Sequence, residues 1–168
     1  MDSFIRLVQD AQALQLNKNI ANAAFDHAVI LCEYLLKEAA EKGKDVRIIT
    51  GELRNEFYNK LYNKAEAYLK DLKAKNKKIY IIIMSKKEQV EQELSSNKFA
   101  EFIVNDLKGE IKFYDRKDEN CLHFFLVGDS SYRYETNHEK VKAVANFNNK
   151  DMGKILSMIF SDKQKKAA

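Results

Sequence analysis

The sequence predicts a single α/β domain in which helices cover both faces of a mixed parallel and antiparallel sheet. Three observations predict this three-layer α/β/α architecture. Apolar strand segments alternate with amphipathic helices through the first two-thirds of the chain. The segment 79–84, IYIIIM, is continuously apolar, which is typical of a parallel strand buried on both faces. Several strand segments then follow one another directly after residue 110, as in antiparallel hairpins.

The composition is that of an ordinary globular domain. The chain has 168 residues, 45% hydrophobic and 32% charged, with no proline and five glycines. This length allows a substantial core, and no segment resembles a linker or a repeat. No apolar run reaches the ~18 residues of a membrane span, and the first residues do not form a secretory signal. We expect one cytoplasmic domain over residues 1–168, with an accessory helix at 1–16 and a basic tail at 163–168.

Each element follows from local periodicity and capping signals. Apolar residues three and four positions apart predict six helices, the fourth opened by a capping box at Ser85–Glu88. Gly43 ends the second helix and Thr50 caps the third. The expected helices are 2–15, 20–42, 50–73, 85–94, 98–108 and a last one from Asn148 or Asn149. The expected strands are 46–49, 79–84, 111–114, 122–127, 132–135 and 141–147.

Several kinds of site are not indicated by the residue pattern. Cys32 and Cys121 lie far apart in apolar segments, so we interpret both as small buried side chains. No glycine-rich phosphate loop follows an early strand, and we expect no cofactor. The histidines are His27, His123 and His138, so a metal site would have to be assembled from distant parts of the chain. We therefore expect no metal.

The net charge of +4 permits an anionic partner without requiring one. Lysines concentrate at residues 70–78, where Lys75, Lys77 and Lys78 precede a strand, and again at 163–166. Two interpretations stay open for the first group. It is either a solvated helix end, which the helix dipole favours, or a patch that faces nucleic acid or phosphate.

Unusual polar side chains gather between residues 121 and 148. His123 stands at the start of an apolar strand, and alternation places Arg133 and Glu135 on one face of the next strand. These two residues either form an ion pair without further function or meet His123 in a site. Asn146 lies in a Val/Ala/Phe strand, where asparagine is disfavoured. If buried, Asn146 needs hydrogen-bond partners, and a polar pocket shared with His123 would supply them.

This segment resembles the phospholipase D-like superfamily. The residues that carry the resemblance are His123-Phe-Phe-Leu-Val-Gly-Asp129, followed by a strand that ends in Ala-Asn146. A strand of that family carries His-x-Lys, an apolar run and Asp, and a following strand presents a small residue and Asn beside the histidine. The order of elements over about 20–162 also resembles one half of that fold. Phe125 stands where the family has its lysine, and Asp129 falls one residue early.

The resemblance implies two functions, depending on how the missing lysine is interpreted. In active members the histidine attacks phosphorus while lysine and asparagine neutralise the phosphoryl oxygens. Without the lysine we expect a non-catalytic binding or regulatory module, whose cleft holds an anionic ligand or a protein partner. Its ligand contacts would be Lys75, Lys77, Lys78 and His138.

The alternative is a metal-independent phosphodiesterase or nuclease, which would work as a homodimer because one half of the fold carries one histidine. His123 would be its nucleophile, Arg133 and Asn146 would bind phosphate, and Glu135 or His138 would move protons. The partners expected are thus a second copy of the chain, nucleic acid or another phosphodiester. An unrelated α/β interaction protein is a third interpretation.

Overall fold

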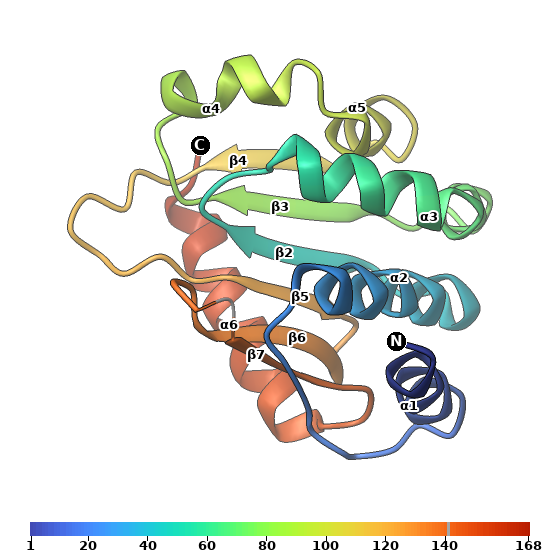
Figure 1. Ribbon diagram of the computed structural model, residues 1–168. Coiled ribbons are helices and arrows are strands. Elements are labelled where there is room, and N and C mark those ends of the chain that lie inside the picture. Colours follow the sequence, from blue (N-terminus) through green and yellow to red (C-terminus); the bar gives the residue numbers. More distant parts are fainter. Residues whose placement is uncertain (141) are drawn as a thin grey trace.

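The computed structural model describes residues 1–140 and 142–168 and has three layers (Figure 1). A seven-stranded sheet with the order β1-β7-β6-β5-β2-β3-β4 forms the middle layer. The strands are β1 (Ile20–Asn22), β2 (Val46–Thr50), β3 (Ile79–Ile83), β4 (Glu110–Phe113), β5 (Phe124–Val127), β6 (Ser131–Asn137) and β7 (Lys142–Asn146). The helices are α1 (Asp2–Ala13), α2 (Phe25–Lys42), α3 (Asn55–Ala74), α4 (Lys87–Leu94), α5 (Lys98–Asn105) and α6 (Lys150–Lys166).

Two hydrophobic clusters, one on each face of the sheet, hold the layers together. Helices α1, α2, α3 and α5 pack on one face, and α6 packs alone on the other (Figure 1). Strand β5 shows the alternation that this requires. Phe125 and Val127 belong to the larger cluster, whereas Phe124 and Leu126 pack with Leu156 and Phe160 of α6. All four residues of β5 are buried, so this strand is covered on both faces.

The predicted three-layer α/β/α architecture and mixed sheet are confirmed. Strands β2, β3 and β4 pair in parallel, and the remaining neighbours pair antiparallel. Strand β4 therefore belongs to the parallel half, although the strand segments after residue 110 indicated antiparallel hairpins. No helix among the described residues has the length and apolar character that a membrane span requires.

The main difference from the sequence prediction is β1, which lies where a helix was expected to begin. Ile20–Asn22 pairs antiparallel with β7, from Ile20 opposite Ala145 to Asn22 opposite Ala143. The Asn22 side chain also donates to the Ala143 carbonyl oxygen at 3.2 Å. Partners more than one hundred residues away thus override a local helical pattern.

Two predicted helix caps were also wrong. Thr50 continues β2 opposite Ile83, and helix α3 begins only at Asn55. Ser85 donates its hydroxyl to the Gly51 carbonyl oxygen at 2.6 Å instead of capping α4. The strand expected from residue 122 begins at Phe124, which leaves His123 just outside the ladder. These differences all fall at one end of the sheet.

The expected basic tail at 163–168 is mostly helical. Helix α6 starts at the predicted cap Asn149, whose side chain accepts the Met152 amide, and runs to Lys166. Ala168 then exchanges two backbone hydrogen bonds with Phe113 of β4. Lys163 pairs with Glu119 at 2.5 Å. These contacts order a segment whose composition alone suggested fraying.

Replacing Gly153 in the first turn of α6 should destabilise the protein. Alanine normally stabilises a helix interior over glycine by roughly 1 kcal/mol. A Cβ at Gly153, however, would lie 1.8 Å from the carbonyl oxygen of Asp129 in the β5–β6 turn. The helix would have to move away, so Gly153→Ala should lower the free energy of unfolding by about 1–3 kcal/mol or more.

Urea unfolding measures this change, with Lys154→Ala as the matched control. Lys154 is the next residue of the helix and is exposed, so its replacement should change the stability by less than about 0.5 kcal/mol. A Gly153→Ala variant as stable as wild type would contradict the close packing of α6 on the β5–β6 turn.

Candidate functional site

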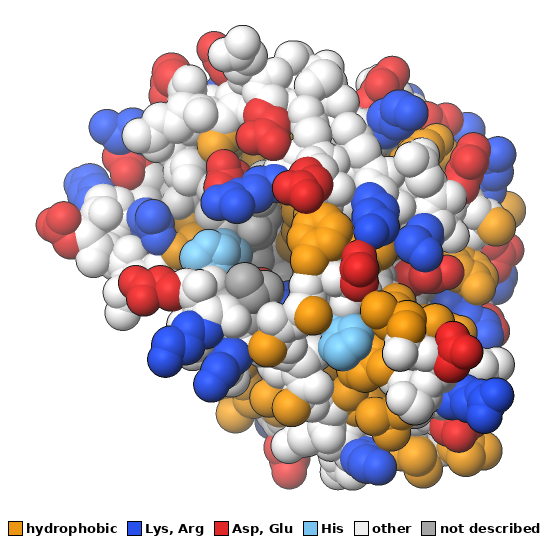
Figure 2. All heavy atoms as spheres, in the orientation of Figure 1, with side chains coloured by type: hydrophobic (Ala, Val, Ile, Leu, Met, Phe, Trp, Pro, Cys, Tyr) orange, Lys and Arg blue, Asp and Glu red, His pale blue; other side chains and the backbone are white. Residues whose placement is uncertain are grey.

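A pocket of about 210 Å³ lies at the edge of the sheet where β2 ends and β5 begins. We call it the His123 pocket. Its floor is formed by the sheet, and its walls by residues of α2 and α3 such as Cys32 and Tyr58. The polar groups that line it include Thr50, His123, Arg133, Glu135 and His138. Figure 2 shows a hollow on this side of the molecule with histidine, acidic and basic side chains around it.

Antiparallel pairing on both sides of β5 places His123 in this pocket. Ile49 of β2 lies opposite Phe124, so the next residue, Thr50, comes close to His123. The Thr50 hydroxyl oxygen lies 3.3 Å from His123 Nδ1. On the other side, the Glu135 amide donates to the His123 carbonyl oxygen at 3.0 Å. Gly51 leaves room for the ring, since a Cβ there would lie 3.4 Å from His123 Cε1.

The contacts of the Thr50 hydroxyl favour one tautomer of His123. Thr50 donates its single proton to the Glu52 carbonyl oxygen at 3.0 Å. With its proton on Glu52, the hydroxyl accepts from His123, and Nδ1 then carries the hydrogen of the neutral ring. Nε2 then carries a lone pair, and this buried atom has no hydrogen-bond partner among the described residues.

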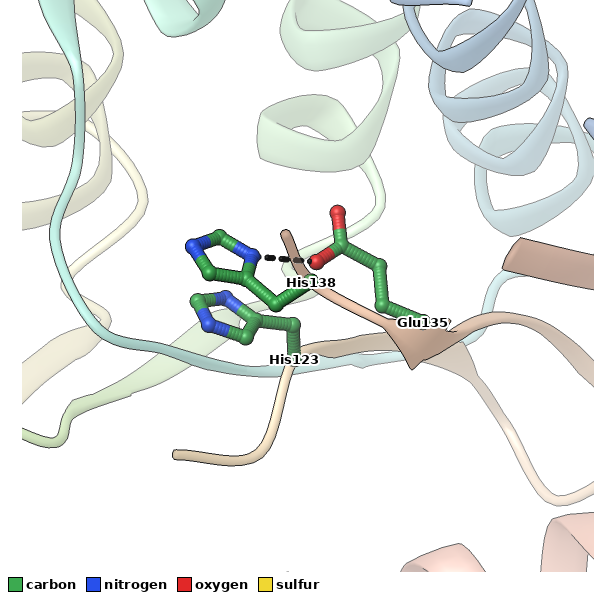
Figure 3. A group of neighbouring side chains, drawn as sticks. All are labelled: His123, Glu135 and His138. Atoms are coloured by element: carbon green, nitrogen blue, oxygen red, sulfur yellow. Dashed lines mark hydrogen bonds and ion pairs between the residues drawn. The ribbon is translucent and has the colours of Figure 1, made fainter. Parts of the chain in front are cut away.

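His123, Glu135 and His138 come together as a compact group, which we call the histidine–glutamate cluster (Figure 3). The two imidazole rings are stacked, with centroids 3.8 Å apart and planes inclined by 7°. The Glu135 carboxylate lies 2.7 Å from His138 Nδ1. One potential ligand atom from each of the three residues lies within 4.8 Å of the others. His138 is at the rim, with 56% of its side chain exposed.

Arg133 lines the same pocket as His123, a relation that strand parity alone leaves open. It lies opposite Phe125 in the β5–β6 ladder. Its Nε donates to the Asn22 side-chain oxygen at 3.1 Å, and its Nη1 to Glu135 at 3.2 Å. The predicted pairing of Arg133 with Glu135 across one residue is therefore present. The third nitrogen, Nη2, is buried without a partner among residues 1–140 and 142–168.

Burial controls the ionisation of the groups in the pocket. Loss of solvent lowers the pKa of His123 to about 4, although the nearby Glu135 opposes this shift. Burial likewise raises the pKa of the Cys32 thiol to about 12. Cys32 is thus an inert buried side chain, as expected. At neutral pH the pocket contains an uncharged His123 beside a compensated Arg133–Glu135 ion pair.

Asn146 is buried, but it does not line the His123 pocket. Its side chain donates to Asn17 at 2.9 Å and to Asn19 at 3.0 Å, and accepts the Asn148 amide at 2.8 Å. In the ladder Asn146 lies opposite Tyr132, whose ring packs in the cluster on the α6 face. The asparagine therefore holds the segment before β1 instead of sharing a polar pocket with His123.

The three candidate lysines lie at the opposite end of the sheet from the pocket. The backbone carbonyl oxygen of Lys78 accepts a hydrogen bond from the amide of Val46, the first residue of β2. Strand β2 then runs roughly 13 Å from Val46 to Thr50, which lines the pocket. Lys75 pairs with Asp71 at 3.1 Å. Lys77 lines a separate shallow hollow with Arg47. Lys75, Lys77 and Lys78 do not contribute to the His123 pocket, so a ligand contact there would be a separate one.

Two residues that shape the site were not predicted to belong to it. Thr50 was interpreted as a helix cap, and Asn22 was placed inside a helix. Both are polar residues next to apolar segments, which is the only sequence signal they carry. Their roles depend on pairing partners distant in the sequence, which periodicity does not reveal.

The fold resembles that of solved phospholipase D-like proteins. No protein-family model matches this sequence, and no curated protein matches it. The archaeal chromatin protein TrmBL2, whose structure shows a novel mode of DNA binding, superposes with a TM-score of 0.62 and 10% identity over 99% of this chain. This chain spans 60% of the length of TrmBL2.

Two further solved structures match this chain over nearly their whole length. Nuc from Salmonella typhimurium, a phospholipase D family member, has a TM-score of 0.62 and 7% identity over 90% of this chain and 97% of its own. NucT from Helicobacter pylori has a TM-score of 0.58 and 8% identity over 90% of this chain and 98% of its own. The chain therefore has a phospholipase D-like fold.

The stability contributed by neutral His123 should disappear as the pH falls. Between pH 6.5 and about 4 the unfolded chain binds a proton at this ring that the folded chain does not. The free energy of unfolding therefore decreases as the pH falls through this window, by at most roughly 3 kcal/mol.

Urea unfolding of wild type and His123→Gln at several pH values tests this. The difference in unfolding free energy between the two proteins should be constant above pH 7 and shift in favour of His123→Gln as the pH falls towards 4. A difference that stays constant through this window would show that His123 is not buried in its neutral form.

Proposed function

We propose that this protein is a non-catalytic, phospholipase D-like binding module that holds an anionic ligand in the His123 pocket. The observation that carries the proposal is that Arg133 lines the pocket and that its Nη2 atom is buried without a partner in the described chain. A buried charged donor without an acceptor is costly. A ligand oxygen in the pocket would remove this cost.

The chemistry of the free donor favours an anionic oxygen. Hydrogen bonds from guanidinium to phosphate or carboxylate are stronger than bonds between neutral groups. The pocket volume of about 210 Å³ is below the range of roughly 300–1,000 Å³ for sites of drug-sized ligands. A single phosphate group, or the phosphorylated end of a larger molecule, is the kind of ligand that suits it.

The absence of catalysis follows from the charge at the lysine position. Phe125 occupies that position and is 4% exposed within the sheet. Arg133 is the nearest cation in the ladder, but Glu135 and Asn22 already hold two of its nitrogens. Stabilisation of a developing phosphoryl charge needs a preorganised donor that is not neutralised by a neighbour. Among the described residues that line the pocket, Arg133 is paired with Glu135 and Arg54 with Glu52. These residues have the means to bind an anion but include no unpaired cation that would accelerate its cleavage.

A second candidate is the homodimeric phosphodiesterase or nuclease that uses His123 as nucleophile. One observation favours it: Arg133 lies on the same face as His123 and lines the same pocket. The resemblance implies that such an enzyme needs a second His123 from a partner copy. The DNA-binding behaviour of TrmBL2 makes nucleic acid a reasonable phosphodiester to test.

Phosphate binding should depend on the second terminal nitrogen of Arg133. Arg133→Lys keeps a positive charge that can pair with Glu135 but removes the planar fork. Losing a charge-assisted hydrogen bond of about 1.5–3 kcal/mol should weaken binding roughly 10- to 100-fold. Calorimetric titration with inorganic phosphate and with a dinucleotide, both in the presence of EDTA, measures the affinities.

Arg6→Lys is the control for this titration, because Arg6 is an exposed residue of α1. Its affinity should equal that of wild type. An Arg133→Lys variant that binds as tightly as wild type, or a wild-type chain that binds neither probe, would reject the proposed anion site.

The same purified protein should not hydrolyse phosphodiesters. Bis(p-nitrophenyl) phosphate and linear DNA, each with EDTA, should show no turnover above that of His123→Ala. The reason is that both described cations lining the pocket, Arg54 and Arg133, are neutralised by glutamates. Turnover by wild type that His123→Ala abolishes would establish the second candidate instead.

A further inference from the structure

We propose that the histidine–glutamate cluster binds a divalent first-row transition metal ion such as Zn²⁺. This metal site does not require a bound anion. It also goes against the expectation from the sequence, where the three residues showed no metal-ligand spacing. The fold supplies the proximity that the spacing lacks (Figure 3).

The donor set is one that such ions prefer. Two imidazoles and one carboxylate form the ligands of known catalytic zinc sites and of the facial triad of non-haem iron sites. One potential ligand atom from each residue already lies within 4.8 Å of the others. Tetrahedral coordination at 2.0–2.1 Å needs ligand atoms about 3.4 Å apart. An approach of little more than one ångström would therefore close the site.

The three side chains differ in mobility in a way that allows this approach. His123 is partly buried and fixed by Thr50, and the Glu135 side chain is 12% exposed and held by Arg133. His138 is 56% exposed in the turn after β6. Rotation of the His138 ring out of the stack would bring its nitrogen towards a cation held by the other two groups.

The neighbouring hydrogen bonds orient the cluster as outer partners of a metal site do. Arg133 Nη1 holds the Oε1 atom of Glu135 at 3.2 Å, which leaves Oε2 directed towards His138. Thr50 holds His123 in a neutral form whose remaining nitrogen has a buried lone pair without a partner among the described residues. Such partners fix ligand orientation and tautomer at metal sites.

Metal titration of the chain, freed of metal with a chelator and without any anionic probe, tests the inference. Competition of Zn²⁺ with a chromophoric chelator should show one tight site per chain, and Co²⁺ should give the visible absorption of a bound ion. His138→Ala should weaken Zn²⁺ binding by more than the roughly 10–100-fold typical of losing an outer partner. Glu135→Gln should do the same.

His27→Ala is the control, because His27 stacks on Phe4 and is not part of the cluster. It should bind Zn²⁺ like wild type. His138 lies in an exposed turn, so thermal unfolding of His138→Ala without metal should match wild type and show that the variant folds. The inference is overturned if wild type has no such site, if His138→Ala retains full affinity, or if His27→Ala loses it. Because this titration has no phosphate and the phosphate titration has no metal, failure of either proposal is recognised separately.

Discussion

The pairing of β5 between β2 and β6 is the constraint on which the rest of the structure depends. This strand has four residues, all buried, and it joins the parallel half of the sheet to the antiparallel half. Its two antiparallel ladders set Thr50 and Glu135 on either side of His123 and Arg133 opposite Phe125. A shift of one residue in either ladder would turn these side chains to opposite faces. The hydrophobic packing of β5 between two helical layers therefore also determines the geometry of the polar site.

Burial explains why the charges of the pocket occur in compensated form. The Arg133 and Glu135 side chains are 8% and 12% exposed, and isolated charges at such depth would be strongly destabilising. Pairing them, with Asn22 on the remaining side of the guanidinium, satisfies most of their hydrogen-bonding capacity. The same loss of solvent keeps His123 neutral. Within the described chain, Arg133 Nη2 and His123 Nε2 are buried without partners, so the pocket is suited to an acceptor oxygen and to a cation at neighbouring points.

The sequence predicted what depends on local periodicity and missed what depends on distant pairing. The apolar strands, the main helices and the shared face of Arg133 and Glu135 all follow from periodicity along short segments. Strand β1 and the role of Asn22 did not, because three residues carry too little pattern to outweigh a helical signal. If buried, Asn146 was expected to need partners, but only the folded chain shows that they are Asn17 and Asn19. The approach of His138 to His123 likewise arises from the turn after β6, whose path no residue pattern specifies.

Glu135 connects the two proposed ligands of the pocket. Its Oε1 atom accepts from Arg133 and its Oε2 atom faces His138, so a cation bound at Oε2 draws electron density from the carboxylate that neutralises Arg133. The guanidinium then has a weaker internal partner and interacts more strongly with an external anion. By thermodynamic reciprocity the anion would strengthen cation binding by the same factor. A metal ion in this cluster would restore positive charge beside His123, in a pocket where the side chain at the lysine position is the phenyl ring of Phe125. Positive charge supplied by a bound ion can be removed by a chelator, whereas the charge of a lysine side chain cannot, so anion binding here would respond to metal supply.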